Sequence, residues 1–195
     1  MHRDTPDEEL MLAYRGGDAA AFDALYARHK GGVFRYLRRQ SGNAAIAEEL
    51  FQDVWMRLID ARARYEPQAK FTTWLYTIAH NRLMDHFRTL KRAALVSYDD
   101  ADDPPPEPVA DTPQPEEMLT RKQDAGRLLA AIDALPAAQR EAFVLQQEGD
   151  LSVEEIAVAT GVNRETAKSR LRYAMAKLRA QLVPAVAAND EMTDR

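Results

Sequence analysis

The residues best suited to chemistry lie near the C-terminal end of the sequence, in the pattern of a helix-turn-helix. Ser152 followed by Glu155 is typical of a capping box that opens a short helix. Gly161 favours a tight turn, and Asn163 is a suitable N-cap for a longer helix that continues to Leu182. A short helix, a turn with glycine and a second, basic helix together indicate a DNA-binding element.

The longer of these two helices has an apolar side and a polar side at 100° per residue. The apolar side is expected to pack on the domain and comprises Ala167, Leu171, Ala174, Leu178 and Leu182. Short polar and basic side chains near a helix N-terminus can reach base edges, while Lys and Arg neutralise phosphates. The predicted DNA-contacting set is Arg164, Thr166, Lys168, Ser169, Arg170, Arg172, Tyr173 and Lys177. The alternative is an amphipathic surface helix with solvated charges.

A second candidate surface surrounds a predicted helix from Thr72 to about Lys91. Its aromatic and basic side chains could provide stacking platforms and phosphate-pairing cations for unpaired bases. The set comprises Arg64, Tyr65, Lys70, Phe71, Trp74, Tyr76, Asn81, Arg82, Arg88 and Arg92. Some of these aromatic rings could instead be core, and we expect at least one of Trp74 and Tyr76 to be buried.

Signals for an enzyme or a metal site are weak. His80, Asp85 and His86 are the candidate ligands, but a spacing of six residues turns the two imidazoles about 120° apart round a helix. The absence of cysteine excludes a disulfide, a zinc-thiolate site and a thiol nucleophile. No phosphate-binding glycine loop or nucleophile motif is present. We therefore expect no cofactor, no metal and no enzymatic activity, and a helical metal-dependent enzyme is a distant alternative.

The elements that position these residues are all predicted to be helices, because apolar residues recur at three and four rather than at two. Thr5 to Glu8 could form a capping box for a first helix, which Gly16-Gly17 would end. Asp18 is suited to cap a second helix. Within that helix Gly31-Gly32 predicts a kink or a break, since each glycine costs about 1 kcal/mol relative to alanine.

Two further helices precede the middle of the chain. The third, from about Asn43 to Ala63, places one apolar face inward, comprising Ile46, Leu50, Val54 and Leu58. Its outward side chains are Glu49, Gln52, Asp53 and Arg57. The fourth is the helix from Thr72, whose predicted apolar face comprises Leu75, Ile78, Ala79, Leu83 and Phe87.

The composition indicates a soluble globular chain with an uneven charge. Its 195 residues are 46% hydrophobic and 29% charged, which is enough for one or two small domains. The net charge is −5, but residues 97–118 carry eight acidic and no basic groups. Proline and like charge there oppose helix and burial, so we predict an extended acidic linker.

The predicted all-α fold therefore has two small helical domains. The expected boundaries are 1–94 for the first domain, 95–117 for the linker, 118–184 for the second domain and 185–195 for a tail. No apolar run approaches the ~20 residues of a membrane span, and no export signal is evident. These absences favour a cytoplasmic protein without membrane insertion.

Several segments, taken in order, resemble one protein family. Residues 18–26 resemble the start of its region 2, residues 47–55 its core-polymerase-binding helix, and residues 71–85 its promoter-melting helix. Leu135-Pro136, Arg140-Glu141 and the segments 151–157 and 165–171 resemble its region 4. Over roughly residues 7–183 the chain resembles the extracytoplasmic-function group of the sigma-70 family of bacterial transcription initiation factors.

This resemblance implies a protein without catalysis of its own, which binds core RNA polymerase and gives it promoter specificity. It implies core-polymerase contacts at Glu49, Gln52, Asp53 and Arg57. It implies recognition and melting of the minus-10 element by Lys70, Phe71, Thr72, Thr73, Trp74, Asn81, Arg82 and Arg88. Region 4 would read the minus-35 element of the promoter DNA, and an anti-sigma factor would be a further partner.

Two questions stay open at this point. The acidic linker could follow a basic polymerase channel, which we favour, or mask the DNA-binding faces of the free protein. The competing function is a stand-alone helix-turn-helix repressor. Such a repressor would usually dimerise on a palindrome, and no obvious dimer helix remains once the segments above are assigned.

Overall fold

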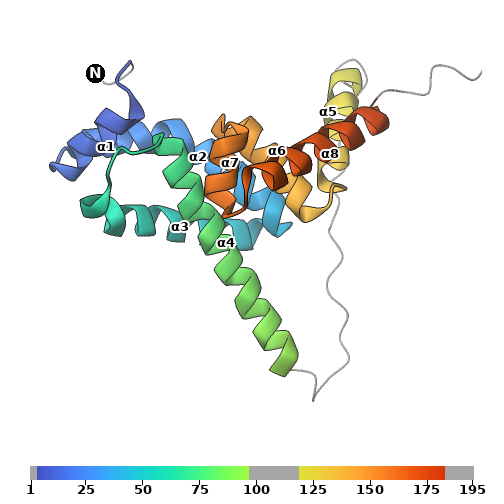
Figure 1. Cartoon of the computed structure of the whole chain (residues 1–195), viewed down its shortest axis with the longest axis horizontal. Coiled ribbons are helices and arrows are strands. Elements are labelled where there is room, and N and C mark those ends of the chain that lie inside the picture. The colour runs from blue at the N-terminus through green and yellow to red at the C-terminus, as the bar shows by residue number, and fades with distance from the viewer. Residues whose placement is uncertain (1–3, 97–118, 183–195) are drawn as a thin grey trace, which may run out of the picture.

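The computed structural model of the chain describes residues 4–96 and 119–182, with side chains for residues 4–93 and 125–182. Throughout these ranges the regular structure is helical and no strand occurs, which confirms the predicted all-α class (Figure 1). The elements are α1 (Asp7–Arg15), α2 (Ala19–Ser41), α3 (Ala44–Ala61), the 3-10 turn η1 (Arg62–Arg64), α4 (Phe71–Val96), α5 (Leu119–Asp133), α6 (Ala137–Gly149), α7 (Val153–Thr160) and α8 (Arg164–Leu182). Apart from residues 95 and 96, which continue α4, the predicted linker lies outside the described residues, as does the predicted tail.

The helix starts of the N-terminal group, α1–α4, follow from their capping residues. Asp18 Oδ1 accepts a hydrogen bond from Ala20 N at 3.0 Å, and Asn43 Oδ1 accepts one from Ala45 N at 2.9 Å. The predicted cap at Asp18 is therefore confirmed, and the structure shows that Asn43 caps α3 in the same way. The predicted capping box at Thr5 is wrong, because Pro6 is the N-cap of α1 and makes no side-chain capping bond. Three acidic residues in the first turn of α1 favour the helix dipole instead.

The break predicted as one alternative at Gly31-Gly32 is also wrong. The helix α2 continues without interruption from Ala19 to Ser41. It packs against α1, α3, α4 and α6, and this surrounding contact compensates for the low helix propensity of the two glycines. Gly32 is buried, whereas Gly31 is only partly so.

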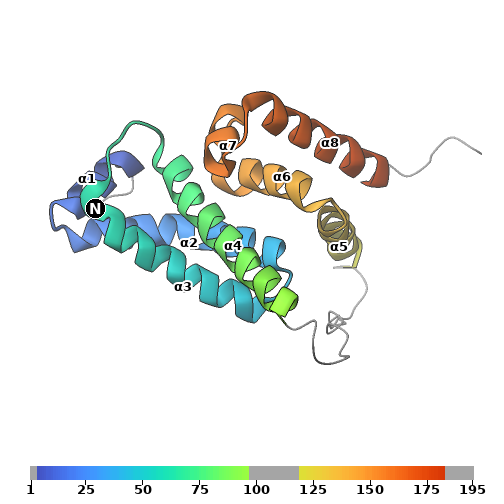
Figure 2. The same cartoon turned by 60° about the horizontal axis from the view of Figure 1, so that its bottom comes forward.

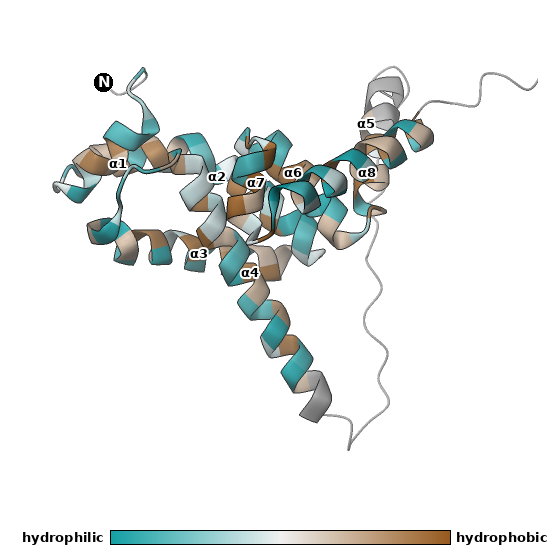
Figure 3. Cartoon of the chain, in the orientation of Figure 1, coloured by the Kyte–Doolittle hydropathy of each residue, from teal (hydrophilic) through white to brown (hydrophobic). Residues whose placement is uncertain are grey.

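The core of the N-terminal group is rich in aromatic rings. Trp55 lies with its ring centroid 4.9 Å from that of Tyr26 and 5.9 Å from that of Phe22, both in tilted or edge-on geometry. The predicted inward face of α3 is confirmed at Leu50, Val54 and Leu58, which are fully buried. Hydrophobic residues of α6 and α7 lie toward the middle of the molecule (Figure 3), and buried residues of both helices belong to the hydrophobic core.

The C-terminal group, α5–α8, has a core of alanine and aliphatic residues. Four predicted packing positions of α8 are buried: Ala167, Leu171, Ala174 and Leu178. The fifth, Leu182, is 38% exposed because it is the last residue of the helix. The α8 helix lies across α6 and α7, so these helices form one layered unit.

The two groups pack directly on each other. Helix α6 lies along α2, and α7 lies along α4, as two views of the molecule show (Figures 1 and 2). The C-terminal half of α4 projects away from the body (Figure 1). Phe87 is 39% exposed on this projecting part, so its predicted place on the buried face of α4 is wrong.

Candidate nucleic-acid interface

The turn between α7 and α8 is fixed at both ends by side-chain caps. Ser152 N donates to Glu155 Oε2 at 2.8 Å, and Glu155 N donates to Ser152 Oγ at 3.2 Å, so the predicted capping box is present. Gly161 ends α7 in the left-handed conformation with φ of 66°. Asn163 Oδ1 accepts from Thr166 N at 2.7 Å and caps α8. The start of α8 is therefore held in one orientation.

The Glu155 carboxyl also contacts the N-terminal group. Burial opposes its ionisation, but hydrogen bonds from Ser152 and Lys70 outweigh that effect and lower the pKa of Glu155. Lys70 Nζ lies 3.3 Å from Glu155 Oε1. One carboxylate thus links the cap of α7 to a residue of the second candidate surface.

The outer face of α8 presents most of the predicted DNA-contacting residues to solvent. Lys168, Arg172, Tyr173 and Lys177 are exposed, and Thr166, Ser169 and Arg170 are partly exposed. The Arg172 guanidinium lies 4.9 Å from the centroid of the Tyr173 ring, a cation–π contact that orients both side chains. The Ser169 hydroxyl donates to the Glu165 carbonyl at 2.9 Å, so it is already engaged within the helix.

Arg164 is held differently from the other basic residues of α8. It pairs with Glu154 on α7 and lies 3.2 Å from Glu165 Oε1. The hydrogen bond from Arg164 lowers the pKa of the Glu154 carboxyl group. Arg164 therefore braces the turn between the two helices in this arrangement.

The start of α4 combines buried and accessible members of the second predicted set. Phe71 and Thr73 are buried, which places them in the core rather than on the surface. Phe71 N donates to Glu8 Oε1 at 2.7 Å, so α1 caps the first turn of α4. Lys70 is exposed, and Thr72 and Trp74 are partly exposed. At least one of Trp74 and Tyr76 was expected to be buried, and Tyr76 is.

The loop before α4 is anchored by an aromatic cluster. The Tyr65 ring centroid lies 4.9 Å from that of Trp74, and Arg15 donates to the Tyr65 carbonyl at 2.8 Å. Burial raises the pKa of Tyr65 to about 12. Trp74 is thereby fixed at the surface with one side of its ring supported.

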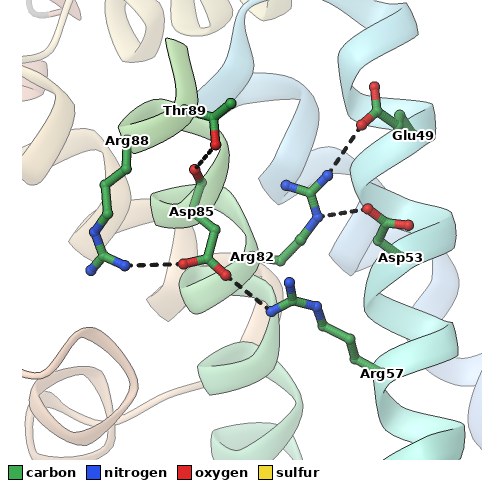
Figure 4. A network of polar contacts seen from close by, with 7 residues as sticks. All are labelled: Glu49, Asp53, Arg57, Arg82, Asp85, Arg88 and Thr89. Carbon is green, nitrogen blue, oxygen red and sulfur yellow. Dashed lines mark hydrogen bonds and ion pairs between the residues drawn. The ribbon is translucent and has the colours of Figure 1, made fainter. Parts of the chain in front are cut away.

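A polar network joins the outer face of α3 to the outer face of α4 (Figure 4). Arg82 on α4 donates from Nε to Asp53 Oδ2 at 2.6 Å and from NH2 to Glu49 Oε1 at 3.1 Å. On the next turn, Asp85 accepts from Arg57 at 3.2 Å and from Arg88 at 3.0 Å. The structure therefore brings the predicted polymerase-contacting residues of α3 beside predicted DNA-contacting residues of α4.

Two family models match the chain along these two groups of helices. The model described as Sigma-70 region 2 matches residues 25–93, and the one described as Sigma-70, region 4 matches residues 125–178. RNA polymerase sigma factor CarQ of Myxococcus xanthus is 34% identical over 173 residues, covering 88% of this chain and 95% of CarQ. The chain belongs to the sigma-70 family.

A second relative narrows this assignment. ECF RNA polymerase sigma factor RpoE of Cereibacter sphaeroides is 33% identical over 179 residues, covering 89% of this chain and 93% of that relative. This sigma-70 family member therefore falls in the extracytoplasmic-function group, as the resemblance predicts. The assignment supports a sigma factor over a stand-alone repressor.

Two solved structures have a similar fold. One is sigma factor RpoE in complex with anti-sigma factor NepR from Bartonella quintana, with a TM-score of 0.63 and 23% identity over 83% of this chain and 96% of that one. The other is CnrH in complex with the cytosolic domain of CnrY, with a TM-score of 0.63 and 23% identity over 90% of this chain and 96% of that one. At this identity the likeness concerns the fold of the sigma factor.

The predicted residue Gln52 and one additional residue lie on the same side of α3. Gln52 is exposed there, and Met56, one turn further along, is 56% exposed. Helical periodicity predicts that Gln52 faces outward, and the prediction did not include Met56. Met56 could have been found from the sequence, because it is a large apolar residue that lies off the buried face of the helix.

The candidate metal ligands of this sigma factor are not brought together. The side chain of His80 points to Glu141 on α6, with Nδ1 at 2.7 Å from Oε1. Among the described residues no group of three or more His, Asp or Glu side chains could hold a metal ion. In the same ranges no helix is both long and apolar enough to cross a membrane.

Proposed function

We propose that this sigma factor binds core RNA polymerase and directs transcription initiation at promoters with minus-10 and minus-35 elements. The observation that carries the proposal is the capped α7–α8 turn, which presents a solvated polar and basic face on a helix anchored by four buried residues. That geometry suits insertion of α8 into a major groove. The catalysis belongs to the polymerase, so the chain acts where polymerase acts, in the cytoplasm.

The assignment of α8 to the minus-35 element divides its residues by role. Arg172 and Tyr173 lie centrally on the exposed face, where base contacts are feasible, and Lys168, Arg170 and Lys177 flank them, where phosphates would lie. We also include Thr166, Ser169 and Arg164 at the start of the helix. In this arrangement Arg164 would have to leave Glu154 to contact DNA.

The assignment of the minus-10 element uses the accessible residues at the start and outer face of α4. We assign direct contacts to Lys70, Thr72, Trp74, Asn81, Arg82 and Arg88. Phe71 and Thr73 would act by holding the loop and the first turn in place, because both are buried. A supported tryptophan beside exposed cations is suited to unpaired bases.

The polymerase-binding surface is assigned to the outer face of α3. It comprises Glu49, Gln52, Asp53 and Arg57, to which the exposed Met56 adds an apolar centre. An apolar anchor surrounded by polar groups is the usual composition of a binding hot spot and its rim. The boundaries we propose remain 1–94 for region 2, 95–117 for the linker, 118–184 for region 4 and 185–195 for the tail.

An anti-sigma factor is the further partner that we propose. Both similar solved structures are complexes with a protein named as an anti-sigma factor or with the cytosolic domain of a partner protein. A protein that binds both groups of helices would block the α3 and α8 surfaces together.

Run-off transcription tests the proposal. Purified chain and bacterial core polymerase would be incubated with a mixed promoter library, and the transcripts sequenced. We expect discrete start sites that require the chain and that core polymerase alone does not use. DNA binding by the chain without any dependence on polymerase, and without transcripts, would instead support a repressor.

The Asn81→Ala variant tests whether promoter melting can be lost while polymerase binding is kept. Asn81 is exposed on α4, so its truncation should leave the core of the N-terminal group intact. We expect impaired open-complex formation, read by permanganate footprinting, with unchanged co-elution with core polymerase. Equal loss of both activities would assign Asn81 a structural role.

A further inference from the structure

A cavity lies between the C-terminal end of α2, the end of α5 and the start of α6. Its volume is about 570 Å³, within the range of about 300–1,000 Å³ that is usual for small-molecule sites. Four arginines line this arginine cavity: Arg35, Arg38 and Arg39 of α2 and Arg140 of α6. Among the described residues that line it, Asp133 is the only carboxylate. None of these residues belongs to the DNA-contacting or polymerase-contacting sets assigned above.

Two of the four arginines are already paired with carboxylates. Arg35 binds Glu148 through two nitrogens, with Nε at 2.8 Å from Oε1 and NH2 at 2.6 Å from Oε2. Arg39 NH1 lies 3.2 Å from Asp133 Oδ1. The charges of Arg35 and Arg39 are therefore balanced within the chain, and the pairs hold both guanidinium groups in place at the wall of the cavity.

The other two arginines carry charge that no carboxylate balances. Arg38 is exposed and has neither a hydrogen bond nor an ion pair with another described residue. Arg140 donates from NH1 to the Asp133 carbonyl at 2.9 Å, but it pairs with no carboxylate in the part of the chain that the structure describes. The cavity therefore contains two positive charges that are available to a ligand.

Two hydrogen-bond donors of the lining residues are buried without a partner. Gln40 is only 7% exposed, and its side-chain Nε2 has no hydrogen-bond partner among the described residues. The same is true of Arg140 Nε. Most buried polar groups in proteins have a partner, so an unpartnered donor requires an explanation. An oxygen-rich anion in the cavity would supply acceptors for such donors.

The helix dipole explains only part of this arrangement. Arg38 and Arg39 lie in the last turn of α2, where positive charge stabilises the end of a helix. This effect does not explain why Arg140 approaches from α6, and it does not explain why a glutamine amide is buried without a partner at the same place. A bound anion explains all three observations together.

We infer that the arginine cavity binds a small molecule of about nucleotide size that carries phosphate groups. The planar guanidinium group pairs with phosphate oxygens through two parallel hydrogen bonds. Two unbalanced positive charges favour an anion with more than one negative charge, which a single carboxylate does not provide. Arg38 and Arg140 supply the charged contacts, Gln40 supplies a neutral donor, and the 43% exposed side chain of Leu129 provides an apolar surface for a base. The inference does not depend on the proposed function.

Calorimetric titration of the full chain tests the cavity with inorganic phosphate, pyrophosphate and ATP as separate probes. The titration is carried out at about 0.15 M ionic strength, where weak attraction between exposed charges is largely screened. We expect saturable binding at one site per chain. Tighter binding of ATP than of pyrophosphate would assign a nucleotide as the ligand, whereas equal or weaker binding of ATP would assign the phosphate groups alone. The absence of saturable binding with all three probes would overturn the inference.

Arg38→Ala tests whether the bound probe occupies this cavity. The side chain is exposed and unpaired, so the variant should fold as wild type, and loss of a charged hydrogen bond should weaken binding at least about tenfold. Arg179→Ala removes the same charge from the exposed last turn of α8, outside the cavity, and is the matched control. Equal weakening in the two variants would mean general attraction to a basic surface and would overturn the inference.

Gln40→Leu distinguishes a ligand contact from a structural role. Leucine has a similar size, and Gln40 Nε2 has no partner to lose among the described residues, so the midpoint of thermal unfolding should not fall. Binding should nevertheless weaken about fivefold. Wild-type affinity in both Gln40→Leu and Arg38→Ala would overturn the inference. Binding of a short single-stranded oligonucleotide, lost in Arg38→Ala and without binding of the three small probes, would also overturn it and assign these arginines to nucleic acid.

Discussion

The N-terminal group of helices encloses an aromatic core, whereas the C-terminal group encloses a core of alanine and aliphatic residues. Large rings bury much area and lock each other through edge-on contacts, as around Trp55. Small residues allow helices to approach closely but bury less area per residue. The two halves of this sigma factor therefore differ in what fixes their functional surfaces.

Because the two cores differ, the two halves hold their binding residues in place by different contacts. In the N-terminal group, a rigid core supports a surface network that spans α3 and α4 (Figure 4). In the C-terminal group, the position of α8 depends on capping bonds at Ser152 and Asn163 and on four buried side chains. We expect the stability of the N-terminal group to change little when a surface contact is removed. The stability of the C-terminal group should fall when a single helix cap is removed.

The largest effect should come from Trp55→Ala. Removing this ring leaves a cavity among Phe22, Tyr26 and Phe51, so the free energy of unfolding should fall by about 3–5 kcal/mol. Urea denaturation followed by fluorescence of the remaining Trp74 would measure it, because both tryptophans lie in the N-terminal group. Trp55→Phe is the control, since the indole nitrogen has no partner among the described residues. A loss below about 1 kcal/mol in Trp55→Ala would mean that the aromatic core is not what stabilises this half.

Arg172→Ala should give the next largest effect, on promoter choice rather than on folding. An arginine that makes a bidentate base contact contributes about 1–3 kcal/mol of discrimination. Competition between promoters that differ only in the minus-35 element would measure it. Arg179→Ala, exposed in the last turn of the same helix, is the matched control and should alter affinity without altering choice. Unchanged promoter choice in Arg172→Ala would remove Arg172 from the base-reading set.

Ser152→Ala should cost the C-terminal group about 1 kcal/mol, the usual contribution of an N-cap. The effect depends on pH because the cap helps to lower the pKa of Glu155 below its ordinary value of 4.5. A lowered pKa contributes stability that is complete above the ordinary value and disappears as pH falls through the lowered value. The midpoint temperature of thermal unfolding should therefore be lower for Ser152→Ala than for wild type at pH 7, and this difference in midpoint should shrink below about pH 4. A difference that grows in acid would contradict this role for the cap.

Arg88→Ala should have the smallest effect on stability. The side chains of Arg88 and Asp85 are 69% and 43% exposed, and solvent-accessible pairs of this kind contribute roughly 0.3–0.5 kcal/mol. The free energy of unfolding should barely change, whereas melting of the minus-10 element should slow if Arg88 contacts DNA. A loss of stability above about 1 kcal/mol would show that the network on α3 and α4 has a structural role.

Local chemistry in the sequence predicted most of the helices and their ends. The caps at Asp18, Ser152 and Asn163 and the turn at Gly161 involve residues within a few positions of each other, so the sequence alone is enough to predict them. The outward residues of α3 and α8 followed from helical periodicity in the same way. These predictions are confirmed by the structure, while the roles of the residues stay predictions.

Contacts between distant segments were not predictable in this way. The Gly31-Gly32 pair weakens an isolated helix, and the close approach of the Tyr76 hydroxyl and the Glu148 carbonyl, both far along the chain, explains why Gly32 has no side chain. The contact between Tyr36 and Glu141 could not be predicted, because a single tyrosine and a single glutamate on separate helices have no pattern that links them. The burial of Phe71 and Thr73 could not be predicted, because it depends on how α1 and the loop before α4 fold over them.

The central claim is that this chain is a sigma factor that works through polymerase, and co-elution with bacterial core RNA polymerase on a sizing column tests it most directly. We predict a stoichiometric complex that elutes with core polymerase. An α3 variant combining Gln52→Ala and Met56→Ala, whose side chains are exposed, should fold as wild type and elute separately from core polymerase. Failure of the wild-type chain to bind, while a known sigma factor binds in the same experiment, would contradict the account.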